Sequence, residues 1–239
     1  MKHTFSALVL AAAVVAPAAP VLAATDDAIV TGPARIISAG GLVYAPVFLG
    51  AGHKEVGVAL GSTNPFRTTG LASPQLLPLA GFGMGLADGL DAAVLISAES
   101  QVGLRQRYAA GNGWSLGGAY VARANVDDKM AWDFGGSYKL AGLVRLGGLE
   151  LTAQPEVSYL TRVGQQAGVA LGADLWPNDH VSVGVNYQMR RALATNTGDT
   201  RIGAGGKYLW TNTTYTWFNY VRTLENAVDV GLVGFGHYY

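Results

Sequence analysis

A strict alternation of apolar and polar side chains is the feature that most constrains what this chain can fold into. In the stretch MAWDFGGSYKL (130–140), Trp132 and Phe134 fall on one face, and Asp133 and Lys139 fall on the other. Successive side chains of a β-strand point to opposite faces, so a period of two predicts a strand. The period does not say which face turns inward, because a soluble sandwich buries its aromatic face whereas a membrane barrel turns that face to lipid.

Alternating runs of this kind recur along the chain and are separated by short turns. Glycine, asparagine and aspartate are frequent in the turns, as in AAGNG (109–113) and TNTGD (195–199), which is typical of tight connections between strands. Alternating runs joined in series predict one all-β domain, an antiparallel up-and-down meander. We predict twelve strands, at 55–63, 77–87, 90–99, 101–108, 114–124, 130–142, 149–161, 166–175, 180–190, 200–210, 213–223 and 227–239.

Two further runs, 28–37 and 41–49, would raise the number of strands to fourteen. Pro33 and Pro46 lie within these runs and weaken the prediction, because proline has no N–H to donate to a β-ladder. The one long connection is NPFRTTGLASPQ (64–75). The sequence therefore predicts about twelve strands, with fourteen as the alternative.

Few charged residues are available to cover the surface of such a domain. Only 13% of the 239 residues are charged, whereas a soluble domain carries about 25%. The chain has no cysteine, so hydrogen bonding and packing alone must hold it together. A transmembrane β-barrel, with apolar faces turned to lipid and polar faces to a lumen, accounts for both the alternation and the scarcity of charge. A secreted soluble β-domain is the alternative.

The first residues, MKHTFSALVLAAAVVAPAAPVLAA (1–24), have the pattern of a secretory signal peptide. A basic start and an apolar run at 7–15 precede small residues suited to signal peptidase. The alternative is a transmembrane anchor, but Pro17 and Pro20 cut the apolar run below the length of about 20 residues that a spanning helix needs. We therefore expect cleavage that leaves residues 25–239 as the barrel domain.

Aromatic residues gather near the ends of the predicted strands. Rings at strand ends are typical of the interfacial girdles of membrane barrels, where they sit at the level of the lipid headgroups. The predicted girdle consists of Tyr108, Trp114, Trp132, Trp176, Tyr208, Trp210, Tyr215, Trp217 and Tyr239.

The C-terminal strand VGLVGFGHYY carries a terminal aromatic, Tyr239, with Phe235 and Val233 on the same face. With these features the chain resembles the bacterial outer-membrane β-barrel proteins, porin-like in general. The strand departs from the pattern of that family in ending with tyrosine rather than phenylalanine and in having His237 where an aromatic is common. The resemblance implies location in the cell outer membrane, contact with its lipid, and recognition by the barrel-assembly machinery through the last strand.

The polar faces of the strands predict a charged lumen. Its predicted lining residues are Arg105, Arg107, Arg123, Asp133, Lys139, Glu150, Glu156, Arg162, Asp174, Arg190, Arg201 and Lys207, with Asp91, Glu99 and Arg222 on the same faces. A barrel of about twelve strands with many small inward residues leaves open volume. We predict a narrow passive pore for small polar solutes with weak or no charge selectivity. A barrel closed by charge pairing, with a structural or adhesive role, is the alternative, and an outer-membrane enzyme is the third.

Nothing in the sequence favours catalysis, a cofactor or nucleic acid. The histidines beyond the signal segment are His53, His180 and His237, and no two of them have the spacing of metal ligands. The string GFGMGLADG (81–89) is similar to a glycine-rich phosphate loop, but it lies in a strand pattern with no helix after it. Sixteen basic and sixteen acidic residues give a net charge of zero, and no basic cluster indicates a nucleic-acid surface. We predict neither enzyme activity nor a bound metal.

Overall fold

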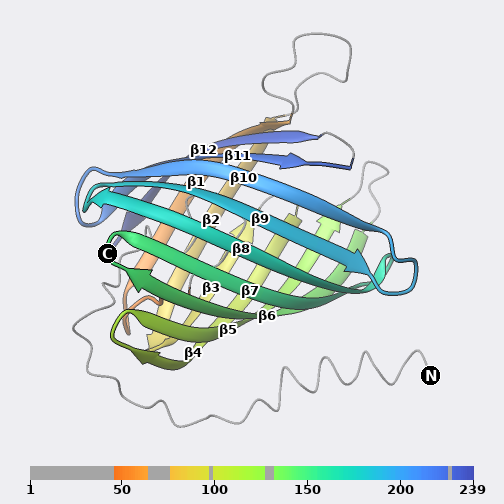
Figure 1. Ribbon diagram of the computed structural model, residues 1–239, viewed down its shortest axis with the longest axis horizontal. Coiled ribbons are helices and arrows are strands. Elements are labelled where there is room, and N and C mark those ends of the chain that lie inside the picture. The colour runs from red at the N-terminus through yellow and green to blue at the C-terminus, as the bar shows by residue number, and fades with distance from the viewer. Residues whose placement is uncertain (1–45, 64–75, 97–98, 127–131, 226–227) are drawn as a thin grey trace.

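Twelve antiparallel strands form one closed barrel in the computed structural model of the protein (Figure 1). The structure describes residues 46–63, 76–96, 99–126, 132–225 and 228–239. Each strand pairs with its neighbours in sequence, and β1 pairs with β12 to close the barrel. The strands are β1 (Lys54–Thr63), β2 (Leu76–Ala87), β3 (Leu90–Ile96), β4 (Glu99–Gly111), β5 (Trp114–Val126), β6 (Trp132–Leu146), β7 (Leu149–Leu160), β8 (Gly164–Asn178), β9 (Val181–Ala192), β10 (Gly198–Leu209), β11 (Thr214–Thr223) and β12 (Asp229–Tyr238).

The predicted all-β, up-and-down barrel with twelve strands is confirmed. The alternative of fourteen strands required a pair at 28–37 and 41–49. Residues up to 45 lie outside the described part of the chain, as does the predicted signal peptide. Residues 46–49 are described and form no strand.

Burial along the strands is the reverse of that in a soluble sheet. In β7, the polar side chains of Thr152, Gln154 and Glu156 are buried, and the apolar side chains of Leu151 and Val157 are exposed. Because alternate side chains leave opposite faces of a strand, one face of β7 lines the interior and the other forms the outer wall. The charged face of the sequence pattern is therefore the inner face, and the apolar face is the outer one.

The two ends of the barrel differ in the length of their connections. At the end where β1 begins and β12 ends, here called the terminal end, β2 and β3 are joined by residues 88–89 and β4 and β5 by residues 112–113. Gly89 and Gly113 have φ of 73° and 75°, a conformation that glycine adopts without steric cost. The opposite end, here called the loop end, carries the longer connections, among them 64–75. Within the described ranges, no helix is long and apolar enough to cross a membrane.

Candidate functional site

The interior of the barrel is the candidate site, because most of the predicted lumen residues share the inner faces of their strands. The side chains on these faces are Arg105, Arg107, Arg123, Asp133, Lys139, Glu150, Glu156, Asp174, Arg190, Arg201 and Lys207, together with Asp91. Arg162 lies instead in the exposed turn between β7 and β8, where its backbone N–H donates to Asp133 Oδ1 at 3.1 Å. Arg222 shares the outer face of β11 with the exposed Phe218 and pairs with Asp229 at 3.9 Å. The side chain of Glu99 lies outside the described residues.

A carboxylate on β7 bridges a cation of β6 and a cation of β9 on the inner wall. Glu156 Oε2 accepts a hydrogen bond from Arg190 Nη2 of β9 at 3.3 Å, and Glu156 Oε1 lies 2.6 Å from Arg190 Nε. Glu156 Oε2 also lies 3.8 Å from the Nζ of Lys139 of β6. The side chain of Glu156 is only 2% exposed. Charge pairing of this kind allows ionised groups to remain in a restricted interior.

At the terminal end, three aromatic side chains pack on the inner faces of β8 and β11. Trp176 and Tyr215 are each 8% exposed and form a cluster to which Trp217 adds a partly buried ring. The indole Nε1 of Trp176 donates to Glu150 Oε2 at 3.3 Å, and the hydroxyl of Tyr215 donates to the carboxylate of Glu55. These rings therefore lie inside the barrel at its terminal end.

The structure thus places Trp176, Tyr215 and Trp217 elsewhere than in the expected lipid-facing girdle. The physical reason is strand parity, because Trp176 shares its face with the buried Asp174 and Tyr215 shares its face with the buried Asn219. Other members of the expected girdle lie exposed on the outside, namely Trp114, Tyr208, Trp210 and Tyr239. The Tyr108 hydroxyl lies 3.2 Å from those of Tyr120 and Tyr138, and the side chain of Trp132 is outside the described residues.

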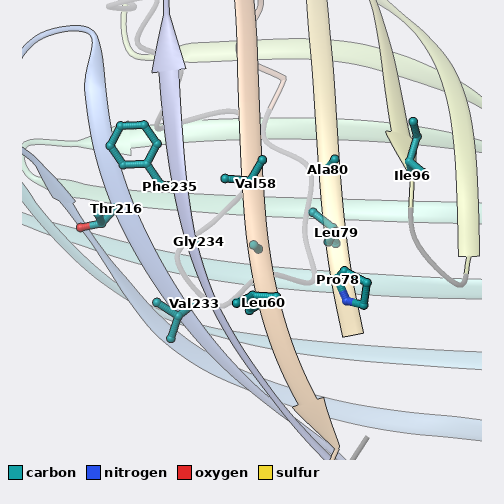
Figure 2. Close-up of a pocket in the computed structure, with 11 residues that line it drawn as sticks. Val58, Leu60, Pro78, Leu79, Ala80, Ile96, Thr216, Val233, Gly234 and Phe235 are labelled. Carbon is teal, nitrogen blue, oxygen red and sulfur yellow. The ribbon is translucent and has the colours of Figure 1, made fainter. Parts of the chain in front are cut away.

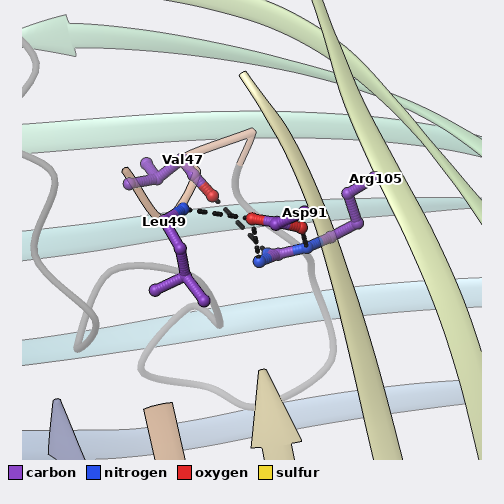
Figure 3. A network of polar contacts seen from close by, with 4 residues as sticks. All are labelled: Val47, Leu49, Asp91 and Arg105. Carbon is purple, nitrogen blue, oxygen red and sulfur yellow. Dashed lines mark hydrogen bonds and ion pairs between the residues drawn. The ribbon is translucent and has the colours of Figure 1, made fainter. Parts of the chain in front are cut away.

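A short segment before β1, Pro46–Leu49, enters the same end of the interior. All four of its residues are buried, with Val47 at 1% and Leu49 at 2% exposed. Its backbone is bound by an ion pair on the barrel wall, in which Arg105 binds Asp91 through two contacts of 2.6 Å (Figure 3). The N–H of Leu49 donates to Asp91 at 3.1 Å, so Asp91 joins the segment to the wall.

Glycines on the wall make room for this segment. A Cβ at Gly85 would lie 2.0 Å from the carbonyl oxygen of Gly50, and a Cβ at Gly117 would lie 2.8 Å from the ring of Phe48. Gly83 and Gly85 belong to the string GFGMG, which is thus a strand whose inner face approaches another backbone closely. Sequence reasoning missed the segment, and this run of alternate glycines was the signal that could have indicated it.

Polar side chains line a cavity of about 300 Å³ at the loop end of the interior. Its charged lining consists of Arg123, Arg190, Arg201 and Asp199. Arg201 pairs with Asp199 at 2.5 Å, and both side chains are about a third exposed. The loop end of the interior therefore contains a polar space with charges of both signs.

The outer wall carries a larger, apolar groove of about 850 Å³ over β1, β2 and β12 (Figure 2). Val58, Leu60, Pro78 and Phe235 are among its lining residues. Such a lining matches hydrocarbon rather than a polar solute, so the groove is not a site for polar ligands.

The histidines lie near the terminal end, each beside a non-acidic group. His53 stacks on Tyr238, His180 Nδ1 lies 3.1 Å from the carbonyl of Leu209, and His237 Nδ1 lies 2.9 Å from the hydroxyl of Thr214. Among the described residues, no group of three or more histidine, aspartate or glutamate side chains could hold a metal ion.

Comparison with known proteins identifies the fold. No protein-family model and no curated protein matches the sequence. Among solved structures, an outer-membrane channel from Pseudomonas putida F1 superposes with a TM-score of 0.62 and 11% identity, over 80% of this chain and 97% of that one. The KdgM porin superposes with a TM-score of 0.60 and 8% sequence identity, over 77% of this chain and 98% of that one. The NanC porin superposes with a TM-score of 0.57 and 10% identity, over 76% of this chain and 98% of that one. The chain therefore has the fold of the outer-membrane, porin-like β-barrels.

Proposed function

We propose that the protein is a narrow, passive outer-membrane channel for small polar solutes, with weak or no charge selectivity. The observation that supports this best is the reversed burial of the wall, whose inner face is charged and whose outer face is apolar. An apolar outer face suits lipid, and a charged inner face suits water and polar solutes. The terminal end, with its short turns, faces the periplasm in this proposal.

The balance of charge supports weak selectivity. Among the described residues, the inner faces carry eight basic and seven acidic side chains. They are Arg105, Arg107, Arg123, Lys139, Arg145, Arg190, Arg201 and Lys207, with Glu55, Asp91, Asp133, Glu150, Glu156, Asp174 and Asp199. Opposite charges that pair within the wall leave little net field for a passing ion to sense.

The proposal includes the partners implied by the membrane location. Val233, Phe235 and Tyr239 are exposed on the outer face, where lipid contact is expected. Recognition by the barrel-assembly machinery through β12 is part of the same proposal. The KdgM porin has also been solved in complex with disordered oligogalacturonate, and we therefore include oligosaccharides among the polar solutes to be tested.

Recording from planar lipid bilayers tests the channel. Refolded protein, verified by heat-modifiable migration in gels, is expected to give discrete conductance steps. Its reversal potential in a salt gradient is expected to stay close to zero, because the inner charges nearly balance. Folded protein that is silent under all conditions would contradict the channel and favour the closed structural or adhesive barrel, an alternative supported by the buried side chains at the terminal end.

An enzyme is the weaker alternative. His180 and His237 contact a backbone carbonyl and a threonine hydroxyl, respectively, and neither contact supplies the carboxylate that orients a catalytic histidine. We therefore propose that the chain acts without catalysis.

A further inference from the structure

We propose that Pro46–Leu49 is a gate segment that narrows the pore at the terminal end, and that the ion pair of Asp91 and Arg105 is the latch that holds it. This inference rests on the proposed channel function. The gate segment lies inside the barrel at the terminal end, where hydrogen bonds, apolar packing and cation–π contacts hold it.

Polar contacts bind the backbone of the gate segment to three wall residues. The N–H of Leu49 donates to Asp91 Oδ2 at 3.1 Å, and Arg105 Nη1 lies 3.5 Å from the carbonyl of Val47 (Figure 3). The hydroxyl of Ser115 donates to the carbonyl of Pro46 at 2.8 Å. The buried carboxylate of Asp91 is 0% exposed, so its contacts are shielded from water. Asp91 is therefore a positioning residue, since it fixes both Arg105 and the gate segment.

Apolar and cation–π contacts also hold the side chains of the gate segment against the barrel wall. Val47 packs against Leu143 of β6 in a fully buried cluster. The ring of Phe48 lies below two guanidinium groups, 5.8 Å from that of Arg105 and 5.6 Å from that of Arg107. Such contacts contribute more when water is excluded, as it is around this ring.

The gate segment can move away from the wall without breaking the strand pairing of the barrel. Pro46–Leu49 takes part in none of the strand pairings of the described residues, and β1 begins only at Lys54. The turn between them is closed by His53 N–H donating to the carbonyl of Gly50 at 3.0 Å, and Gly52 there has φ of 79°. A glycine turn next to a side-chain latch is a hinge of the kind that gating segments need. The latch, rather than the β-ladder, therefore sets the position of the gate segment.

Thiol labelling tests the placement of the gate segment without relying on conduction. The chain has no cysteine, so Val47→Cys introduces a single thiol. The reference is the variant Asp88→Cys, whose thiol lies in an exposed turn. We expect a water-soluble maleimide to label the thiol of Val47→Cys at least about tenfold more slowly than that of Asp88→Cys, because one hydrogen bond to a charged group is strong enough to shift an equilibrium about tenfold. Adding Asp91→Asn is expected to raise the rate about tenfold. Glu156→Gln is the matched control, since it also removes a buried carboxylate paired with arginine but its ion pairs lie away from the gate segment. Two results would overturn the latch. One is rapid labelling of Val47→Cys in the absence of any other substitution, and the other is an equal increase in the labelling rate when Glu156→Gln replaces Asp91→Asn.

Bilayer recording tests the consequence for the pore. The triple variant Val47→Ser, Phe48→Ser and Leu49→Ser removes the apolar contacts of the gate segment and leaves every wall residue in place. We expect this variant and Asp91→Asn to show a larger conductance, or an open state occupied about tenfold more often, than the native chain. Native and variant channels that conduct alike would overturn the gate and leave the channel intact. Silence of all variants, each verified as folded, would overturn the channel function and the gate with it, whereas the labelling result would still report where the gate segment lies.

Discussion

Replacing Glu156 by glutamine is expected to lower the free energy of unfolding of the barrel by about 3–5 kcal/mol. The Glu156 carboxylate is 2% exposed and pairs with Arg190 at 2.6 Å and with Lys139 at 3.8 Å. Glutamine keeps the size of the side chain but removes the negative charge that faces Arg190 and Lys139 on the inner wall, and removing one partner of a buried ion pair is costly where water is restricted. Urea titration of the protein refolded in lipid vesicles measures the loss.

The matched control is Asp199→Asn, which breaks the pair of Asp199 with Arg201. That pair is as short, at 2.5 Å, but its side chains are 27% and 36% exposed. Water can replace the lost partner there, so a loss below about 1 kcal/mol is expected. Equal losses for the two variants would contradict the view that Glu156 is the buried centre of the wall's charge pairing.

In the channel, Glu156→Gln is also expected to move the reversal potential toward the equilibrium potential of the anion, because it removes a negative charge from the lumen.

Replacing Trp176 by alanine is expected to lower the free energy of unfolding by about 3–5 kcal/mol, the usual loss for a large buried ring. Trp176 packs against Tyr215 inside the barrel and is 8% exposed, so its removal leaves a cavity and removes the hydrogen bond that Trp176 Nε1 donates to Glu150. The same urea titration measures this loss. Trp210→Ala is the control, because that ring is 62% exposed on the outside and is expected to cost markedly less.

Fluorescence separates the interior position of Trp176 from a place in the lipid-facing girdle. In variants that retain one tryptophan each, with the others replaced by phenylalanine, brominated lipid is expected to quench Trp114 strongly and Trp176 weakly. The reason is that heavy-atom quenching needs close approach, and Trp114 is exposed on the outer wall whereas Trp176 lies inside. Equal quenching of the two would place Trp176 at the lipid interface and contradict its inward packing.

The strands could be predicted from the sequence because their signal is local. The range 149–161 was expected and Leu149–Leu160 is observed, and the range 180–190 corresponds to Val181–Ala192. Side-chain direction follows from the alternation within each strand, so it needs no knowledge of the neighbours. The scarcity of charge then indicated which face turns outward, and the burial in β7 agrees.

The depth and direction of the aromatic rings could be predicted only in part. In β11, aromatic residues occupy both faces, with Tyr215 on the inner face and Phe218 on the outer face. A position near a strand end therefore predicts that Tyr215 lies near an end of the barrel, but it does not predict the side of the wall. Parity with Asp174 would have placed Trp176 correctly, because a charged residue marks the inner face of β8.

The sequence by itself determined an up-and-down β-barrel of about twelve strands with a charged inner face, because a period of two and a low content of charge act through each strand separately. Only the tertiary structure decided which side chains and which segment occupy the interior at the terminal end. Pro46–Leu49 meets Asp91, Arg105 and Ser115 from strands 42 to 69 residues further along the chain. No local pattern encodes these contacts, since they form only when barrel closure brings β3, β4 and β5 around the segment that precedes β1.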